Sequence, residues 1–277
     1  MQALTPICRL WLGVLQMYDA FAVIKHVLPR DYTHINIYGM SDAHIGAKES
    51  SLATLRAWVR TVLDDPYGYV IVAGDMINNG IKDSKTNVYE EVMPPRQQKR
   101  VCAEIFKPLA DAGRILAWIP GNHEERSARS VDDDPSYDIC VSLGIEDVWR
   151  PDCAVVKISV GSAKKDRQVA YGVCVTHGSS QNKHRKFVAQ LENFDVAFSG
   201  HTHAQSVEPM YKMHLDLNSG TVKWKRCRIV VLPSLLDYAS YAVRKELTPQ
   251  MYGSIPVITL CGTRKRVDYH EYDTMIT

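Results

Sequence analysis

Aspartate, asparagine and histidine residues gather in five short segments of this 277-residue chain, each placed directly after a run of apolar residues. In chain order the segments are Asp42-Ala43-His44, Gly74-Asp75-Met76-Ile77-Asn78, Gly121-Asn122-His123-Glu124, Thr176-His177-Gly178 and Gly200-His201-Thr202-His203. Two metal ions a few ångströms apart need several nitrogen and oxygen donors and one bridging carboxylate. The segments supply these donors without any cysteine, so the sequence predicts a two-metal centre.

Rigid elements must hold these segments close together in space. The apolar runs predict strands over residues 35–40, 69–73, 115–119, 154–160, 169–176, 196–199, 227–232 and 255–260, and helical periodicity predicts helices over 51–63 and 99–112. Loops that leave strand ends can converge on one rim of a sheet, which brings residues distant in sequence into one site. The alternation of helices and strands predicts an α/β fold, a four-layer α/β/β/α sandwich of two mixed β-sheets flanked by helices.

Three segments lie outside this pattern. We expect residues 82–98 to form an ordered excursion near the site and residues 131–137 to form a surface loop. Residues 1–34 are expected to form an N-terminal helical extension to a domain over 35–277. Within the extension, residues 8–26 predict an amphipathic helix that packs on the domain or on a second subunit, which leaves a homodimer open. A signal peptide is the alternative, but its basic region would be a single arginine and polar residues interrupt the apolar run.

The bulk composition selects neither a nucleic acid nor a membrane as partner. The chain has 33 basic and 31 acidic residues, a formal net charge of +2. No segment reaches the ~20 apolar residues that span a bilayer, so no membrane partner is expected. The seven cysteines are odd in number and widely spaced, which favours free thiols in a reducing cytoplasm.

In content and order, the five segments resemble the DxH, GDxx[DN], GNH[DE], H and GHxH signature of the calcineurin-like metallophosphoesterases, over the stretch from Asp42 to His203. The resemblance implies hydrolysis of a phosphoester by a hydroxide that bridges two divalent metal ions. Carried over residue by residue, it assigns one ion to Asp42, His44, Asp75 and His203, and the other to Asp75, Asn122, His177 and His201. Asp75 would be the bridge. The donor types favour manganese, with iron, zinc, magnesium or nickel as alternatives.

The same resemblance suggests which residues assist the reaction. His123 matches the family's catalytic histidine, which protonates or polarises the leaving oxygen. Asn78 falls where that histidine often has an acidic partner, and an asparagine could orient the imidazole by hydrogen bonding. Arg126 could bind the phosphoryl group, with a surface ion pair to Glu124 or Glu125 as the alternative.

Departures from one branch of the family bear on the substrate. The phosphoprotein phosphatases hold phosphate with two arginines, and Asn79 and Pro120 stand at those positions here. Without two bidentate clamps a dianionic monoester is held less well, so we expect phosphodiesters. Three alternatives stay open, namely a phosphomonoesterase, a DNA exo- or endonuclease, and a non-catalytic interaction scaffold.

The nuclease alternative has two sources in the sequence. Three features are similar to those of bacterial and bacteriophage-type metallophosphoesterases, some of which resemble DNA-repair exonuclease subunits. They are the sequence of residues 121–126, the 82–98 excursion and the strand-rich tail. Basic residues also cluster at positions 96–100, 183–186 and 223–228. The 183–186 cluster follows His177 closely and could bind a polyanion at the rim of the site, whereas a solvated surface is the alternative for all three clusters.

Overall fold

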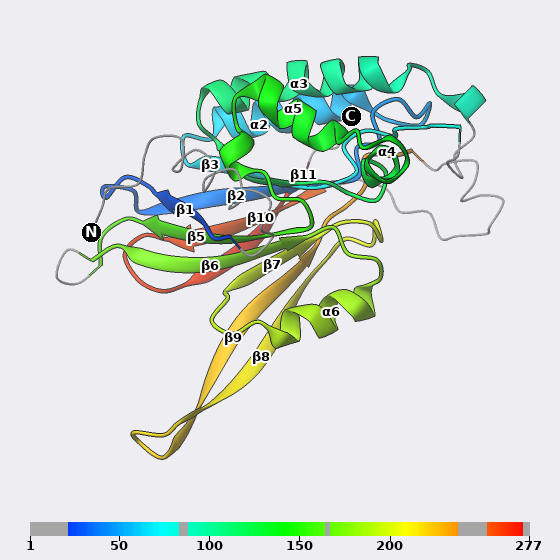
Figure 1. The fold of residues 1–277 in the computed structure, drawn as a ribbon. Coiled ribbons are helices and arrows are strands. Elements are labelled where there is room, and N and C mark those ends of the chain that lie inside the picture. Colours follow the sequence, from blue (N-terminus) through cyan, green and yellow to red (C-terminus); the bar gives the residue numbers. More distant parts are fainter. Residues whose placement is uncertain (1–21, 83–87, 164–166, 238–253, 274–277) are drawn as a thin grey trace, which may run out of the picture.

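Parallel strands form the centre of the first of two sheets in the computed structural model, which describes residues 22–82, 88–163, 167–237 and 254–273 (Figure 1). The sheet has the order β11-β10-β2-β3-β4. β2 (His34–Met40), β3 (Gly68–Ala73) and β4 (Ile115–Ile119) are parallel neighbours, while β10 (Ser254–Cys261) and β11 (Val267–Asp273) are antiparallel additions. Every residue of β3 and β4 is buried, as continuous apolar runs in a parallel sheet predict.

The second sheet has six strands in the order β1-β5-β6-β7-β9-β8. Its members are β1 (Ile24–Val27), β5 (Cys153–Val160), β6 (Val169–Thr176), β7 (Val196–Ser199), β8 (Ser206–Asp216) and β9 (Thr221–Val231). β6, β7 and β9 run parallel to one another. The loops after β6 and β7 therefore leave the sheet at the same edge.

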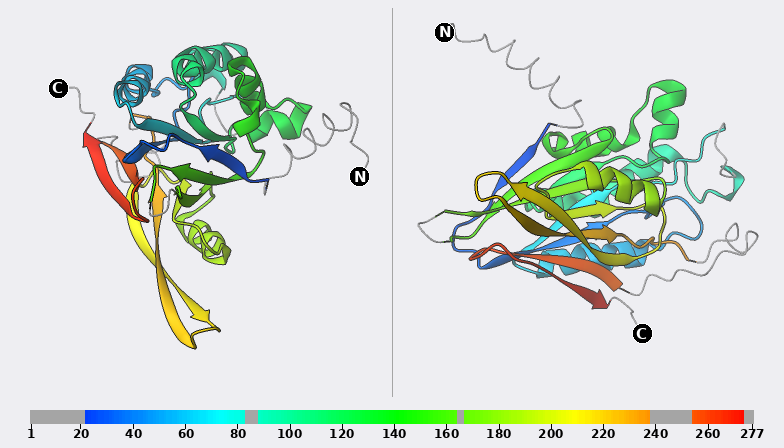
Figure 2. Two further views of the ribbon diagram at one scale, coloured as in Figure 1. Left: turned by 90° about the vertical axis from the view of Figure 1, so that its left-hand side faces the viewer. Right: turned by 90° about the horizontal axis from the view of Figure 1, so that it is seen from below.

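Helices cover the outer face of each sheet. α2 (Leu52–Asp64), α3 (Pro95–Asp111) and α5 (Pro135–Leu143) lie over the sheet that contains β2 and β3, and α6 (Gln181–Gln190) lies on the outer side of the other sheet (Figures 1 and 2). The two sheets face each other across one continuous hydrophobic core. This arrangement confirms the predicted α/β/β/α sandwich of two mixed sheets.

The helix α2 illustrates how the sequence sets these layers. Its N-cap residue Ser51 accepts a hydrogen bond from the Thr54 amide, which satisfies one of the free donors of the first turn. The buried residues Leu55, Trp58, Val59 and Val62 recur at helical spacing and form the face that packs on the sheet.

The structure corrects two of the expected boundaries. α3 begins at Pro95 rather than at residue 99, because a proline at the first helical position needs no amide partner. The expected loop at 131–137 is mostly helical, since α4 (Glu125–Val131) runs up to it and α5 begins at Pro135. Short 3₁₀ turns, η1 (Val88–Glu90) and η2 (Glu146–Val148), complete the elements.

The N-terminal expectation is also revised where the structure describes it. Residues 24–27, which the predicted helix was to include, are strand β1 and pair in parallel with β5. This strand belongs to the sandwich, although the sequence placed residues up to 34 in an extension. Residues 1–21, which hold the rest of the predicted helix, lie outside the described residues.

Strands β8 and β9 form a long antiparallel hairpin that continues beyond the sandwich. Its cross-strand pairs run from Ser206 with Val231 to Asp216 with Thr221. The distal half projects away from the two sheets (Figures 1 and 2). We call the part from Met210 to Cys227 the hairpin arm. Among the described helices, none is both long and apolar enough to cross a membrane.

Candidate metal centre

The five polar segments converge at one rim of the sandwich. Each begins where a strand ends, after β2, β3, β4, β6 and β7. Three overlapping groups have ligand atoms within 4.8 Å of one another: Asp42, His44 and His203; His44, Asp75 and His123; and Asp75, His177 and His201. Asp75 and His44 each belong to two groups. The parallel strands thus bring residues that are up to 161 positions apart into contact.

Backbone strain is concentrated at these residues. Asp42, His44, Asp75, His201 and His203 all have left-handed backbone conformations, with φ between 46° and 67°. Such conformations cost on the order of 1–3 kcal/mol each for residues other than glycine. The surrounding fold holds these side chains in place at that cost, which is typical of a functional site.

The two oxygens of Asp42 have different environments. Oδ2 accepts hydrogen bonds from the Ser41 hydroxyl and from the His201 main-chain amide. Oδ1 lies 3.2 Å from Nε2 of His203 and 3.8 Å from Nε2 of His44. Oδ2 is therefore held by hydrogen bonds from the protein, whereas Oδ1 is directed at the two imidazoles.

The two oxygens of Asp75 also have different environments. Its Oδ1 accepts the His123 main-chain amide at 2.8 Å. Its Oδ2 lies 3.1 Å from Nε2 of His177, 3.9 Å from Nε2 of His123 and 4.0 Å from Nε2 of His44. Burial acts to raise the pKa of Asp75, but the surrounding histidines, His177 first, hold it well below its usual range. A single anionic oxygen thus faces both halves of the cluster.

Asn122 and two histidines form the other side of the cluster. Oδ1 of Asn122 lies 3.1 Å from Nε2 of His177 and 2.7 Å from Nδ1 of His201. Nδ1 of His177 donates to the Ala73 carbonyl at 2.8 Å, which leaves Nε2 directed into the site. Burial acts to lower the pKa of His177, yet the Asp75 carboxylate outweighs it and raises the pKa to about 10.

His44 provides the test of whether a metal ion fits here. Both ring nitrogens are buried and neither has a hydrogen-bond partner, which is rare for a buried polar group. Burial, and next the neighbouring His123, lower the pKa of His44 to about 3, so the ring is neutral at physiological pH. A neutral imidazole with free nitrogens beside two carboxylates is what a divalent transition metal requires. The donor set fits such an ion.

His123 is held by a main-chain group rather than by the side chain that the sequence suggested. Its Nδ1 donates to the Asn78 carbonyl oxygen at 2.8 Å, and Nη1 of Arg126 donates to the same oxygen at 3.2 Å. The Asn78 side chain instead donates to Oε1 of Glu91 at 2.6 Å. The orienting role of Asn78 is thus carried by its backbone. Glu125, one of the two ion-pair partners considered for Arg126, pairs with Arg129.

Glu124 is a residue whose role the sequence did not reveal. Its buried carboxylate accepts the main-chain amides of Asp75 at 3.0 Å, Ile77 at 3.0 Å and Gly121 at 2.8 Å. It therefore joins the loops after β3 and β4. Burial, and then the nearby Asp75, raise the pKa of Glu124 to about 7. The sequence signal that could have identified Glu124 was its place at the acidic position that ends the GNH[DE] pattern.

The same two loops approach each other closely at a pair of glycines. Gly74 has φ of +87°, and a Cβ atom added to it would lie 2.6 Å from Cα of Gly121. Neither position has room for a side chain, and Gly74 also needs a conformation that L-residues rarely adopt. Because both positions are glycine, the two loops lie close enough for the Glu124 carboxylate to accept hydrogen bonds from each of them.

The two positions where related phosphatases carry arginine have structural roles here. Asn79 is fully buried, and its Nδ2 donates to the His123 carbonyl at 2.8 Å and to the Ser127 hydroxyl at 2.9 Å. Pro120 lies directly after β4. Neither residue can hold a phosphoryl oxygen as a guanidinium does.

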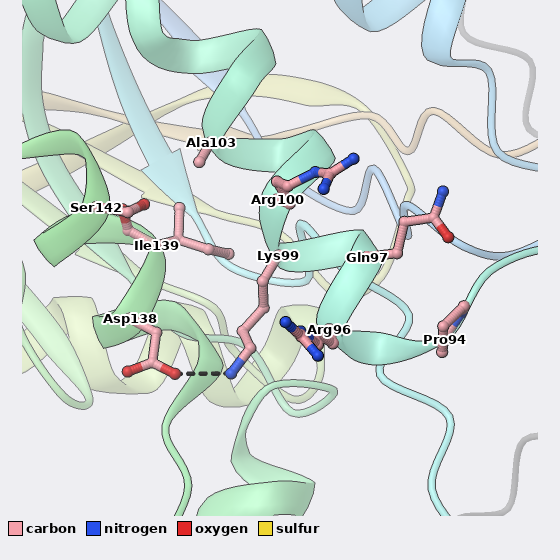
Figure 3. A pocket seen from close by; sticks show the side chains of 9 residues that line it. All are labelled: Pro94, Arg96, Gln97, Lys99, Arg100, Ala103, Asp138, Ile139 and Ser142. Atoms are coloured by element: carbon pink, nitrogen blue, oxygen red, sulfur yellow. Dashed lines mark hydrogen bonds and ion pairs between the residues drawn. The ribbon is translucent and has the colours of Figure 1, made fainter.

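Acidic neighbours neutralise much of the basic surface noted in the sequence. Lys99 pairs with Asp138 in a pocket between α3 and α5 (Figure 3), and this pocket is lined by residues other than those of the Asp/His cluster. Arg185 pairs with Glu208. Lys183 and Lys186, by contrast, are exposed on α6, which begins shortly after His177.

Two comparisons with known proteins bear on this site. The family described as calcineurin-like phosphoesterase matches residues 35–205, which span all five segments. A search of curated proteins finds no significant match to this chain.

Proposed function

The chain belongs to the calcineurin-like phosphoesterases and is a metal-dependent hydrolase of phosphoesters, and from this premise we propose that its substrates are phosphodiesters. The family and the Asp/His clusters together support a binuclear site for divalent metal ions. The observation that supports a site for two ions is the position of Asp75, whose Oδ2 atom faces both halves of the cluster, and the observation that carries the diester proposal is the absence of arginine at positions 79 and 120.

We assign the ligands as the sequence suggested. Asp42, His44, Asp75 and His203 would hold one ion, and Asp75, Asn122, His177 and His201 the other. The contacts within each set support the assignment, because the metal-facing atoms are those that accept no bond from the protein backbone. The mixed oxygen and nitrogen donors favour manganese.

Divalent ions held by these two sets of residues would supply activation of a water molecule and neutralisation of charge on the phosphoryl group. His123 is positioned to handle the proton of the leaving group. Its Nδ1 is committed to the Asn78 carbonyl, so Nε2 is the atom that can donate to the leaving oxygen. Nε2 lies on the Asp75 side of the ring, next to the ligand cluster.

Preference for a diester rests on the two positions that lack arginine. A dianionic monoester gains most from paired guanidinium clamps, and Asn79 and Pro120 offer none. Arg126 is the remaining guanidinium beside the catalytic histidine, where it shares the Asn78 carbonyl. One arginine suits the single negative charge of a diester.

A matrix of metals and substrates tests the proposal. Metal-free protein is loaded with manganese, iron, zinc, magnesium or nickel and assayed on a chromogenic diester and the matching monoester. We expect hydrolysis to require metal and kcat/KM to be higher for the diester. A higher kcat/KM for the monoester would replace the proposal with a phosphomonoesterase. Metal binding without any hydrolysis would indicate an interaction scaffold.

DNA is the diester favoured by one specific observation. Lys183 and Lys186 are exposed on α6, the helix that begins four residues after His177. A strand of nucleic acid whose scissile phosphate sits at the ions would pass this helix. We therefore keep a DNA nuclease as the second candidate.

We also propose that the protein works in a reducing cytoplasm. Cys102, Cys140, Cys174 and Cys227 are buried as free thiols. Buried thiols of this kind act as small apolar side chains, and they are common where disulfides do not form.

A further inference from the structure

The two faces of the hairpin arm differ sharply in composition. On one face the cross-strand neighbours are Tyr211 with Arg226, Met213 with Trp224, and Leu215 with Val222. Opposite residues of an antiparallel pair point to the same side, and successive residues alternate. This face, which we call the apolar face, thus carries five large apolar side chains and an arginine but no acidic residue.

The other face of the arm is charged and tied to the body of the protein. Lys212 donates to carbonyls at the end of α6, at 3.1 Å from that of Val188 and 2.9 Å from that of Ala189. Lys225 pairs with Asp195 at 3.6 Å, and Lys223 pairs with Asp216. The arm is therefore held in position by its charged face, which presents the apolar face to solvent.

The exposed apolar area is large enough to need an explanation. The five apolar residues of the face and Leu217 in the turn are each between 54% and 85% exposed. At roughly 150–250 Å² for a large side chain, the exposed area is on the order of 700 Å². Single exposed apolar residues are ordinary, but a contiguous patch of this size marks an interaction site.

We propose that the apolar face of the hairpin arm is the interface through which two copies of this chain form a symmetric dimer. The patch matches the ~800 Å² that each partner contributes to a standard protein interface. Its composition of tyrosine, tryptophan, methionine and arginine, with lysine kept off it, is that of an interface core.

A second copy suits the face better than another partner does. In a two-fold dimer the same patch meets itself, so its charges must be compatible with their own copies. Arg226 meets this condition, because a guanidinium can stack on Trp224 or Tyr211 of the partner copy without an acidic residue. Arg228, two residues further along the strand, already stacks over Tyr269 within the chain, at 4.8 Å from the ring centroid.

Nucleic acid fits the face less well. Lysines that could follow a phosphate backbone point to the opposite side, where several are engaged. Three of the five apolar side chains, Met213, Leu215 and Val222, are aliphatic, so Tyr211 and Trp224 are the two on this face that could stack on bases. The proposal stands on the hairpin arm alone and does not depend on the substrate of the metal centre.

Sedimentation of the full chain tests the dimer, with variants on the two faces of the arm. Wild-type protein should sediment with twice the mass of the chain. Trp224→Lys should weaken association by about 30-fold or more, the size expected for a central interface residue. His214→Lys, on the charged face of the arm, is the matched control and should associate as wild type does. Circular dichroism spectra that match among the wild type and the two variants show that each is folded.

Tryptophan fluorescence gives an independent readout. Trp224 is exposed, whereas Trp58, Trp118 and Trp149 are buried, so dilution of the dimer should shift the emission to the red. Met213→Lys, on the other strand, should weaken association as well and covers the case in which Trp224→Lys fails to fold.

Three results would overturn the proposal. They are a monomeric wild-type chain at the highest concentration tested, an unchanged dimer in Met213→Lys, and equal weakening by His214→Lys. If the wild-type chain is monomeric and binds single-stranded DNA, and Trp224→Lys loses that binding, the face docks nucleic acid instead.

Discussion

Nδ1 of His123 donates its hydrogen bond to the main-chain carbonyl oxygen of Asn78, at 2.8 Å. A carbonyl fixes the tautomer and the plane of the imidazole as well as a side-chain acceptor would, but it adds no negative charge. The contact that the sequence assigned to the Asn78 side chain is thus made by the Asn78 backbone. Mutation of Asn78 cannot remove that group.

The first prediction separates His123 from Asn78. His123→Ala should keep the metal content and reduce kcat by roughly 10²- to 10⁴-fold, the usual contribution of general acid–base assistance. Asn78→Ala should reduce kcat by less than about 10-fold on that same scale, because the main-chain carbonyl remains. Metal analysis and steady-state kinetics on a chromogenic diester measure both. Loss of metal from His123→Ala, or equal damage in the two variants, would contradict the assignment.

The second prediction concerns the shared ligand. Asp75→Asn should weaken the binding of both metal ions, because one oxygen of Asp75 faces both groups of ligands. Asp42→Asn is the control and should weaken one ion only, since the free oxygen of Asp42 faces only His44 and His203. Titration of metal-free protein with manganese, followed by elemental analysis, counts the ions retained. Normal binding of one ion by Asp75→Asn would refute the bridge.

The third prediction tests DNA as a substrate. Replacing Lys183 and Lys186 together with glutamine should weaken DNA binding and flatten its dependence on salt, since each phosphate contact contributes to the salt slope. Hydrolysis of a small chromogenic diester should be almost unchanged. Arg185→Gln is the matched control, because this arginine already pairs with Glu208. If the double variant and the control bind DNA equally well, α6 does not contact nucleic acid.

The fourth prediction follows from the buried His184. This residue is 3% exposed, its Nδ1 lies 3.2 Å from the Thr176 hydroxyl, and its Nε2 has no hydrogen-bond partner. Burial, and next Arg185, lower the pKa of His184 to about 4, whereas an unfolded chain has a value of about 6.5. Between these values the unfolded state binds the extra proton. The free energy of unfolding should therefore fall as pH drops from about 6.5 to about 4, by on the order of 2–3 kcal/mol.

Denaturant unfolding at several pH values measures this effect. His184→Asn should lack that part of the pH dependence, while the same substitution at the exposed His214 should keep it. Other groups titrate in this range in all the variants, so the comparison is the difference between each variant and wild type. An identical pH dependence in His184→Asn and wild type would show that His184 does not titrate as the structure implies.

Much of the metal cluster could be predicted because its residues are local exceptions in an apolar pattern. Asp42, Asp75 and His177 follow strands that are almost wholly buried, and a charged residue at such a point needs a functional reason. The order of the segments then identifies a family, and membership of that family predicts the α/β/β/α sandwich. Strand periodicity locates the centre of each strand, but not the cap that begins a helix such as α3.

The contacts that hold His123 could not be predicted in the same way. They depend on which atom of Asn78 faces the imidazole ring. The Asn78 side chain is hydrogen-bonded to Glu91, 13 residues further along the chain, so the Asn78 carbonyl faces the ring instead. α6 was missed because its sequence is dominated by polar residues, with only a short apolar face. The hairpin arm was missed because half of its side chains pack on nothing within the sandwich, so burial does not shape its sequence pattern.

The strand pairing of β1 sets where the chain can be cut for recombinant work. A fragment trimmed to residues 35–205 would keep the Asp/His cluster but lose β1 from the edge of β5, β10 from the edge of β2 and β9 from the edge of β7. All three newly opened edges would present unpaired amide and carbonyl groups to other molecules, which is a common route to aggregation. A shortened chain intended for crystals or assays should therefore begin before Ile24 and extend through β11.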